Sequence, residues 1–364
     1  MKTKSRGKDM KKISNIAVIG CGRIAQNAHF PALSEIDGVR VKYACDIIPE
    51  KARAMKEKYP ALVGEAITDY RVALADPEVE AVFVLTPNHA HYTVTMDALR
   101  AGKHVMCEKP VTVSYELSVE MQKEADRQGK ILNIGVCNRY QSSVERLAEM
   151  NRAGELGKVY HAVCSFRAFR SIPGLGGPFT TRAESGGGVL IDWGVHFVDL
   201  ILYILGDARV ISASAATYSE MAKDMKKYRH RGMWAEDTSD VEGGTNDVDD
   251  FVTGFVRTDK GTISINGAWA QNIDRGEMFV DLLGDRRGVR LDYCGQFHLT
   301  DGETLETVTS EHELGNMYLA EDEAFLVAAA NGEKTRSNID RVIESMRLLD
   351  ALYRSAECGE EVRL

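Results

Sequence analysis

The sequence lacks several features that would assign its 364 residues to other classes of protein. No basic block stands out beyond the first dozen residues and the net charge is −9, so we expect no nucleic-acid partner. No apolar run reaches the roughly 18–20 residues of a membrane helix, and the basic N-terminus leads into a short strand pattern, not a signal peptide. We therefore expect a cytoplasmic protein that has no membrane partner. Residues 1–12 are expected to form a solvated tail.

Paired cysteine motifs are also missing. The chain has seven cysteines, scattered through apolar segments and never spaced as CxxC. An odd, scattered set is typical of reduced core thiols in a reducing compartment. The sequence thus predicts neither a disulfide framework nor a metal site.

What is present is a soluble composition, 44% hydrophobic and 27% charged, at a length that suits two domains. Over residues 13–137, six short apolar strands alternate with mostly helical segments. Such alternation predicts an α/β domain, a doubly wound parallel sheet of the Rossmann type.

After residue 137 the pattern changes to strands joined by hairpins, around 248–270 and 278–293. Residues 138–337 are therefore predicted to form an α+β domain on a large, open, mostly antiparallel sheet, and residues 338–358 a helix that packs back on the body. Residues 220–246 are polar without periodicity, which indicates an insertion or lid-like loop. We expect a partner subunit to cover the sheet face that no helix covers, with Phe251, Thr253, Phe255, Ile263 and Ile265 on it, giving a homo-oligomer.

A glycine motif follows the first strand. Gly20, Gly22 and Ala25 form G-x-G-x-x-A before a helical stretch, and a second strand ends at Asp46. The glycines allow a tight turn and close approach of a pyrophosphate, while the carboxylate suits an adenosine ribose. This spacing predicts dinucleotide binding. Because Asp46 repels a 2′-phosphate and no arginine adjoins it, the preferred cofactor is NAD.

A second constellation lies in the stretch from Glu184 to Gly206. Three glycines precede a helical pattern in which Asp192 and His196 are four residues apart, so an α-helix would place them on one face. A carboxylate and an imidazole at the start of a buried helix suit acid/base chemistry. The same spacing also fits a capped helix with a core histidine, and the local pattern leaves both interpretations open.

Four segments together carry a family resemblance: GCGRIA at 20–25, HVMCEKP at 104–110, GGG…DWGVH at 186–196, and the terminal ALYRSAECGEEV. In this order they resemble the glucose–fructose oxidoreductase and inositol dehydrogenase family (Gfo/Idh/MocA). The resemblance implies hydride transfer between NAD and a secondary ring hydroxyl of a sugar, glycoside or cyclitol, including C3 of a glycoside. It also implies dimers or dimers of dimers through the second domain's sheet.

The resemblance assigns site residues as well. Lys109, Asp192 and His196 match the family's catalytic residues, and a cis bond is expected between Lys109 and Pro110. The expected cofactor contacts are Gly20, Gly22, Arg23, Ile24, Asp46, Thr86, Asn88, His91, Glu108 and Lys109. The expected substrate contacts are Asn138, Arg139, Tyr140, Arg167 and Trp193. Rim salt bridges are an equal alternative for the first four, and Trp193 could stack on a sugar face.

Two other functions stay open from the sequence. Some members of this superfamily hydrolyse glycosides with bound NAD as a transient oxidant, by C3 oxidation and elimination. A non-catalytic sugar-sensing protein on the same fold is the other. The presence of Lys109, Asp192 and His196 together favours a dehydrogenase, because a binding protein has no need of all three.

Overall fold

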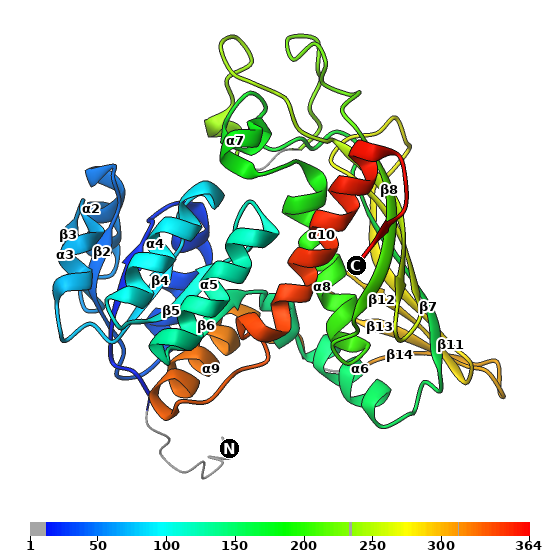
Figure 1. Ribbon diagram of the computed structural model, residues 1–364, viewed down its shortest axis with the longest axis horizontal. Coiled ribbons are helices and arrows are strands. Elements are labelled where there is room, and N and C mark those ends of the chain that lie inside the picture. Colours follow the sequence, from blue (N-terminus) through cyan, green and yellow to red (C-terminus); the bar gives the residue numbers. More distant parts are fainter. Residues whose placement is uncertain (1–11, 233–234, 312) are drawn as a thin grey trace.

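The computed structural model describes residues 12–232, 235–311 and 313–364, and it contains two sheets in two side-by-side bodies (Figure 1). Of the predicted tail, residues 1–11 lie outside the described residues. The first sheet has six strands and the second has nine. The chain forms the first body, then the second, and returns to the first before its last helix.

The first sheet has the predicted Rossmann topology. Its six strands are parallel in the order β3-β2-β1-β4-β5-β6. The strands are β1 (Asn15–Ile19), β2 (Arg40–Cys45), β3 (Val63–Ile67), β4 (Ala81–Val84), β5 (His104–Glu108) and β6 (Leu132–Gly135). The helices between them are η1 (Ala25–His29), α1 (Phe30–Glu35), α2 (Pro49–Lys58), α3 (Tyr70–Ala75), α4 (Asn88–Arg100) and α5 (Tyr115–Gln128).

Helix α9 (Met317–Asn331) lies against this first sheet although it comes near the end of the chain (Figure 1). Its buried Phe325 and Leu326 join the core of β1 and β4, and the ring of Phe325 makes an edge contact with that of Phe83. The sequence pattern predicts that residues 138–337 belong to the second domain. The structure instead gives the first domain a helix from that range.

The second sheet is mixed and mostly antiparallel, in the order β14-β13-β12-β11-β7-β10-β9-β8-β15, with only the β7–β10 pair parallel. Its strands are β7 (Val159–Arg167), β8 (Val210–Tyr218), β9 (Phe251–Thr258), β10 (Thr262–Ala268), β11 (Glu277–Gly284), β12 (Arg287–Asp292), β13 (Phe297–Asp301), β14 (Thr307–Thr309) and β15 (Val362–Arg363). The short helices before and beside it are η2 (Cys137–Tyr140), η3 (Pro178–Thr180), α7 (Arg182–Ser185), η4 (Leu190–Gly194) and η5 (Glu236–Thr238).

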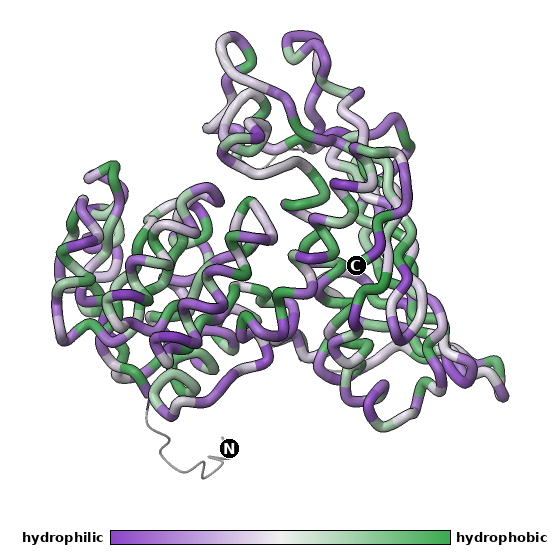
Figure 2. Tube along the Cα trace, viewed as in Figure 1, coloured by the Kyte–Doolittle hydropathy of each residue, from purple (hydrophilic) through white to green (hydrophobic). Residues whose placement is uncertain are grey.

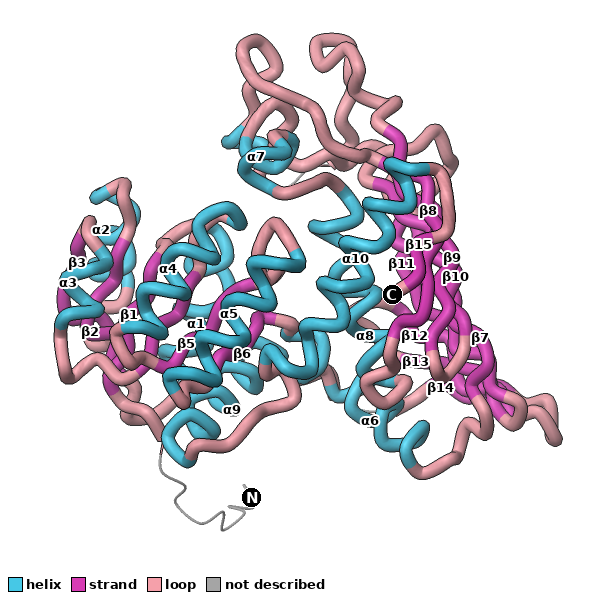
Figure 3. Tube along the Cα trace, in the orientation of Figure 1, coloured by secondary structure: helices cyan, strands magenta, loops and turns pink. Residues whose placement is uncertain are grey.

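Helices cover one face of this sheet. Helices α6 (Ser142–Arg152), α8 (Val195–Ile204) and α10 (Ile339–Cys358) lie on the inner side, towards the first domain, and the outer side faces solvent (Figure 3). Helix α10 packs on both β8 and α5, as predicted for a helix that returns to the body.

The predicted outer face needs a correction. Phe255 lies opposite Ser264, so odd-numbered residues of β9 share a face with even-numbered residues of β10. Phe255 is therefore on the outer face, whereas Ile263 and Ile265 point inwards and are buried. The outer face is less apolar than the sequence predicted.

By length and composition residues 182–204 pass the test for a membrane-spanning helix, contrary to the prediction that no such run exists, although bends at 186–188 interrupt the helix. However, 89% of its apolar window is buried inside the protein. Figure 2 shows this green segment between the first domain and the second sheet. Core helices pass the same test of length and composition, and its burial identifies this segment as one of them.

Candidate active site

The glycine loop after β1 has the geometry of a dinucleotide site. Gly20 has φ +96°, and a Cβ there would lie 2.4 Å from the carbonyl oxygen of Leu85. A Cβ on Gly22 would meet nothing within 4 Å, so the backbone of the loop faces open space. Asp46 accepts the Cys21 N–H at 2.9 Å with Oδ2 and the Ile48 N–H at 2.9 Å with Oδ1.

These residues fit an NAD molecule. The loop leaves room for a pyrophosphate at Gly22, and Asp46 is fixed beside it where a ribose would lie. Thr86 adds a buried hydroxyl that has no partner among the described residues. Arg23 forms an ion pair with Asp237 of the second domain, and Ile24 precedes η1.

The E-K-P segment brings the predicted lysine to the boundary between the domains. The Lys109–Pro110 peptide bond is cis, as predicted. Lys109 Nζ donates to the backbone oxygen of Asp192 at 3.1 Å and to its Oδ1 at 3.2 Å. Asp192 Oδ2 is buried and has no partner among the described residues. The structure therefore brings two of the three predicted catalytic residues into contact.

The helix that carries Asp192 and His196 differs from the expected α-helix. Its first turn, η4, is a π-helix, and the α-helical turns begin at Val195. A π turn is wider than an α turn, so residues four apart no longer lie directly above each other. Within the described residues, no hydrogen bond joins Asp192 to His196. Instead His196 Nδ1 lies 3.3 Å from the side-chain nitrogen of Asn138.

His196 lies in an environment that disfavours its charged form. Burial, together with the charge of Lys109, holds the pKa of His196 well below its usual range. Tyr293, which sequence reasoning missed, makes an edge contact with the His196 ring and accepts a hydrogen bond from Asn138 at 3.2 Å. His196 is thus a neutral imidazole at neutral pH, next to an ammonium group.

Asp249 anchors the glycine loop before this helix, and sequence reasoning missed it too. Its Oδ1 accepts the Gly188 N–H at 2.8 Å and the Tyr353 hydroxyl at 2.9 Å, and its Oδ2 accepts the Leu190 N–H at 3.0 Å. A Cβ on Gly188 would lie 1.8 Å from the backbone oxygen of Asp249, so only glycine fits there. These contacts fix where η4 begins, and with it Asp192.

Two further predicted cofactor residues, His91 and Asn88, hold the surrounding backbone. His91 is fully buried, with its ring nitrogens 2.8 Å from the Pro110 oxygen and 2.9 Å from the Thr86 oxygen. Asn88 donates to the backbone oxygen of Ser185 in the second domain at 2.9 Å. Burial lowers the pKa of His91. The buried ring of His91 therefore links the backbone after β4, at Thr86, to the backbone of the E-K-P segment, at Pro110.

The predicted substrate residues do not gather at one place. Asn138 lies at His196, and Trp193 is half-buried beside Asp192. Arg139 is fully buried and makes two hydrogen bonds to Asp199, at 2.8 and 2.7 Å. Such a guanidinium is held by the core and has no access to a substrate.

Two more of these residues point elsewhere. Tyr140 is buried, with its hydroxyl 2.9 Å from Ser337 Oγ. Arg167 pairs with Glu277 on the outer face of the sheet, because its neighbour Phe166 faces inwards against Phe197. Alternation along β7 thus carries Arg167 to the face opposite the catalytic helix.

The predicted insertion packs over the loop that leads to α7. Asp240 N–H donates to the Leu175 oxygen at 2.9 Å, and Thr180 Oγ1 donates to the Thr245 oxygen at 2.8 Å. Its η5 turn carries Asp237, the partner of Arg23. The insertion therefore reaches from the second domain to the dinucleotide loop.

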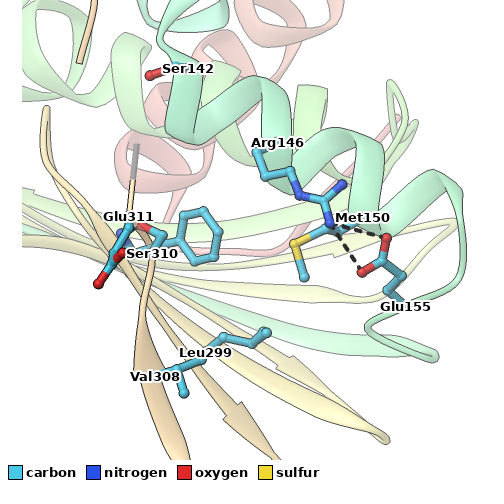
Figure 4. A pocket seen from close by; sticks show the side chains of 9 residues that line it. Ser142, Arg146, Met150, Glu155, Leu299, Val308, Ser310 and Glu311 are labelled. Carbon is cyan, nitrogen blue, oxygen red and sulfur yellow. Dashed lines mark hydrogen bonds and ion pairs between the residues drawn. The ribbon is translucent and has the colours of Figure 1, made fainter. Parts of the chain in front are cut away.

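A separate cavity of about 420 Å³ lies between α6 and the β13–β14 edge (Figure 4). Its walls include Met150, Leu299 and Val308, with Arg146 bonded to Glu155 at one end. None of the predicted site residues lines it. The cavity is distinct from the candidate active site.

Comparisons with known proteins agree with this geometry. Residues 14–136 match the model "Oxidoreductase family, NAD-binding Rossmann fold", and residues 144–289 match "GFO/IDH/MocA C-terminal domain". The D-glucoside 3-dehydrogenase of Escherichia coli (strain K12) is 31% identical over 354 residues, which are 96% of this chain and 97% of that protein. The chain belongs to the GFO/IDH/MocA family of NAD-binding oxidoreductases.

Solved structures with a similar fold align with nearly the whole length of this chain. The aldose-aldose oxidoreductase from Caulobacter crescentus, complexed with glycerol, has a TM-score of 0.81 at 23% identity and covers 97% of this chain and 100% of its own. Levoglucosan dehydrogenase, in complex with NADH and levoglucosan, has a TM-score of 0.82 at 18% identity, covering 96% of this chain and 99% of its own. At these identities the likeness describes the fold.

Proposed function

We propose that this protein oxidises a secondary ring hydroxyl of a sugar, glycoside or cyclitol with NAD. The contact between Lys109 Nζ and Asp192 Oδ1, at 3.2 Å, carries the proposal, since it joins the E-K-P and D-W-G-V-H segments across the domain boundary. The likeness to D-glucoside 3-dehydrogenase over nearly the full length of both chains supports a glycoside C3 hydroxyl as the first substrate class to test.

Each residue has a chemical part. The Lys109 ammonium donates a hydrogen bond to the substrate hydroxyl and stabilises the alkoxide that develops from it. His196, held neutral by its surroundings, accepts the hydroxyl proton. Asp192 holds the Lys109 ammonium in place because its backbone oxygen and its Oδ1 both accept hydrogen bonds from Nζ. When bound, NAD supplies the hydride acceptor.

The cofactor contacts follow the geometry of the first domain. We infer that the glycine loop binds the pyrophosphate, Asp46 the adenosine ribose, and Glu108 the nicotinamide ribose. Glu108 supports this placement because it adjoins Lys109 at the carboxyl end of β5, the edge where open α/β sheets bind ligands.

The test is a panel of glycosides, free sugars and inositols with NAD⁺, followed by NADH absorbance. We expect net NADH from at least one substrate, and a loss of about 10²–10³-fold in kcat for Lys109→Met. Lys260→Met, at an exposed turn, is the matched control. Release of a free aglycone without net NADH would favour hydrolysis instead, and an inert panel would refute the proposal.

We also propose a cytoplasmic homo-oligomer. All seven cysteines are free, which suits a reducing compartment. The outer face of the second sheet carries Phe251, Phe255 and Phe279 among polar residues, and no helix covers it. Sedimentation at micromolar concentration should give a mass above one chain, whereas a monomer would contradict this interface.

A further inference from the structure

A chain of buried hydrogen bonds runs from helix α9 to the E-K-P segment. His29 Nδ1 lies 3.0 Å from Asp322 Oδ1 on α9, and His29 Nε2 lies 3.0 Å from Glu108 Oε1 at the end of β5. Glu108 Oε2 in turn accepts the Lys109 N–H at 2.9 Å. His29 and Asp322 are fully buried, and Glu108 nearly so. Three elements thus meet at one imidazole.

A carboxyl group faces each ring nitrogen of His29. A carboxylate accepts hydrogen bonds, so this pairing favours an imidazole with a proton on both nitrogens. In agreement, the two carboxylates raise the pKa of His29 well above its usual range, although burial alone would lower it.

The surroundings leave little freedom to Glu108. A Cβ on Gly135 would lie 2.8 Å from Glu108 Oε1, so the neighbouring strand packs directly on the carboxylate. The rings of Phe83 and Tyr318 make edge contacts with His29 on its other sides. Every contact in the chain is therefore enclosed by packed side chains.

The other titratable groups nearby are Glu321, Tyr318 and Cys137. Burial raises the pKa of each, which keeps all three neutral. Glu321 is fully buried, and its carboxyl oxygens have no partner among the described residues. Burial raises the pKa of Asp322 as well, and the charge and hydrogen bond of His29 oppose that effect.

We propose that His29 and Asp322 are positioning residues that hold the Glu108 carboxyl group in place at the nicotinamide end of the cofactor site. Helix α9 then acts on cofactor binding without touching the cofactor. The inference rests on the proposed function in one respect, the placement of the nicotinamide ribose at Glu108. The proton arrangement around His29 does not depend on that placement.

The first experiment uses the wild-type protein without cofactor. Ring-nitrogen NMR of His29 should show both nitrogens protonated at about pH 8, well above the ordinary histidine pKa. In Asp322→Asn the uncharged amide can turn its NH2 group towards Nδ1, so His29 should lose the Nδ1 proton and keep the proton that it donates to Glu108. A neutral His29 in the wild type would overturn the inference even if no variant folds.

The second experiment measures NADH affinity by fluorescence titration. We expect Asp322→Asn to weaken NADH binding about tenfold, because Glu108 then accepts its hydrogen bond from a neutral imidazole in place of a cation. Glu321→Gln is the control. It changes the buried carboxyl group next to Asp322, a group that takes no part in the hydrogen bonds of His29, and it should leave both NADH affinity and the His29 signals unchanged. Thermal melting of both variants identifies any general loss of stability.

The outcomes separate the two proposals. If wild-type protein does not bind NADH, the proposed function fails, while the NMR result still tests the proton arrangement. If the wild type binds NADH and a folded Asp322→Asn protein binds it equally well, the positioning role is refuted. Equal weakening in Asp322→Asn and Glu321→Gln would also refute it, because it would indicate a general effect of core substitution.

Discussion

The side-chain amide of Asn138 lies 3.3 Å from Nδ1 of His196. The amide can present either its oxygen or its nitrogen to the ring, and the choice sets the imidazole tautomer. With the oxygen facing His196, Nδ1–H donates to it and Nε2 is free to take a proton. With the nitrogen facing the ring, Nε2 carries the proton and can only donate. The structure places the amide nitrogen at Nδ1, and the proposed base role of His196 needs the amide turned so that its oxygen faces the ring.

This relationship predicts a shift in pH dependence. Asn138→Asp places a carboxylate at Nδ1, which stabilises the imidazolium and raises the pKa of His196. The acidic limb of kcat/KM should move to higher pH by about one unit or more. Asn138→Ala should lower kcat without that shift. Identical profiles for Asn138→Asp and wild type would show that this contact does not tune His196.

The charge of Lys109 gives a second prediction. A cation near an imidazole disfavours its protonation, so Lys109→Met should raise the pKa of His196. Burial, the larger cause, remains, and the pKa should stay below its usual range. Lys109→Arg keeps the charge and is the matched control. NMR titration of His196 in the protein without cofactor measures both, and an unchanged titration in Lys109→Met would contradict the arrangement.

The anchor of the glycine loop predicts a third result. Gly188→Ala would force a methyl group into the Asp249 backbone, displacing η4 and lowering kcat by at least tenfold. Gly315→Ala is the control, since its Cβ would meet nothing within 4 Å.

Tyr353→Phe is a smaller change at Asp249, the residue that holds the glycine loop. It removes one of three hydrogen bonds to Asp249 and should cost about 1 kcal/mol of stability. NADH affinity, set in the first domain, should be unchanged in Gly188→Ala and in Tyr353→Phe. A fully active Gly188→Ala enzyme would show that the helix start tolerates displacement.

Cofactor choice is the fourth prediction. Asp46 is held by the Cys21 and Ile48 amides, so its carboxylate cannot turn away from a 2′-phosphate. NADH should therefore bind at least about tenfold tighter than NADPH, and Asp46→Asn should narrow that difference. Fluorescence titration with both nucleotides decides the matter. Equal or tighter NADPH binding to the wild type would contradict it.

The fifth prediction separates stability from substrate binding at Arg139. Arg139→Met leaves Asp199 charged and buried, which should cost about 3–5 kcal/mol in unfolding free energy by urea titration. The substrate KM should be unchanged for the folded fraction. Lys227→Met, which breaks an exposed pair with Asp224, should cost at most about 1 kcal/mol. A raised KM without loss of stability would restore Arg139 to the substrate site.

Much of the first domain could be predicted because its signals are local. A buried strand, the G-x-G-x-x-A turn and Asp46 at the next strand end each depend on a few adjacent residues. Helix α9 gave no such signal. Glu321 and Asp322 occupy its buried face beside Phe325 and Leu326, so polar and apolar residues do not separate by side. These buried acidic residues interrupt the apolar pattern by which amphipathic helices are recognised.

The candidate site shows the same limit. The lysine, aspartate and histidine could be named from short motifs, but their contacts depend on registers and turns. The π turn at Leu190–Gly194 separates Asp192 from His196, and the β9–β10 register turns Ile263 away from Phe255. Asn138 and Tyr293 lie 58 and 97 residues from His196, beyond any spacing rule.

Because α9 packs on the first sheet, the nucleotide domain cannot be cut out of the gene as one continuous stretch. A fragment that stopped after β6 would leave Phe83 and His29 without their α9 neighbours, exposing apolar rings and leaving His29 with Glu108 but without Asp322. Chimeras with related dehydrogenases would therefore have to exchange two separate stretches, one from each half of the gene, for the nucleotide domain to keep its own core.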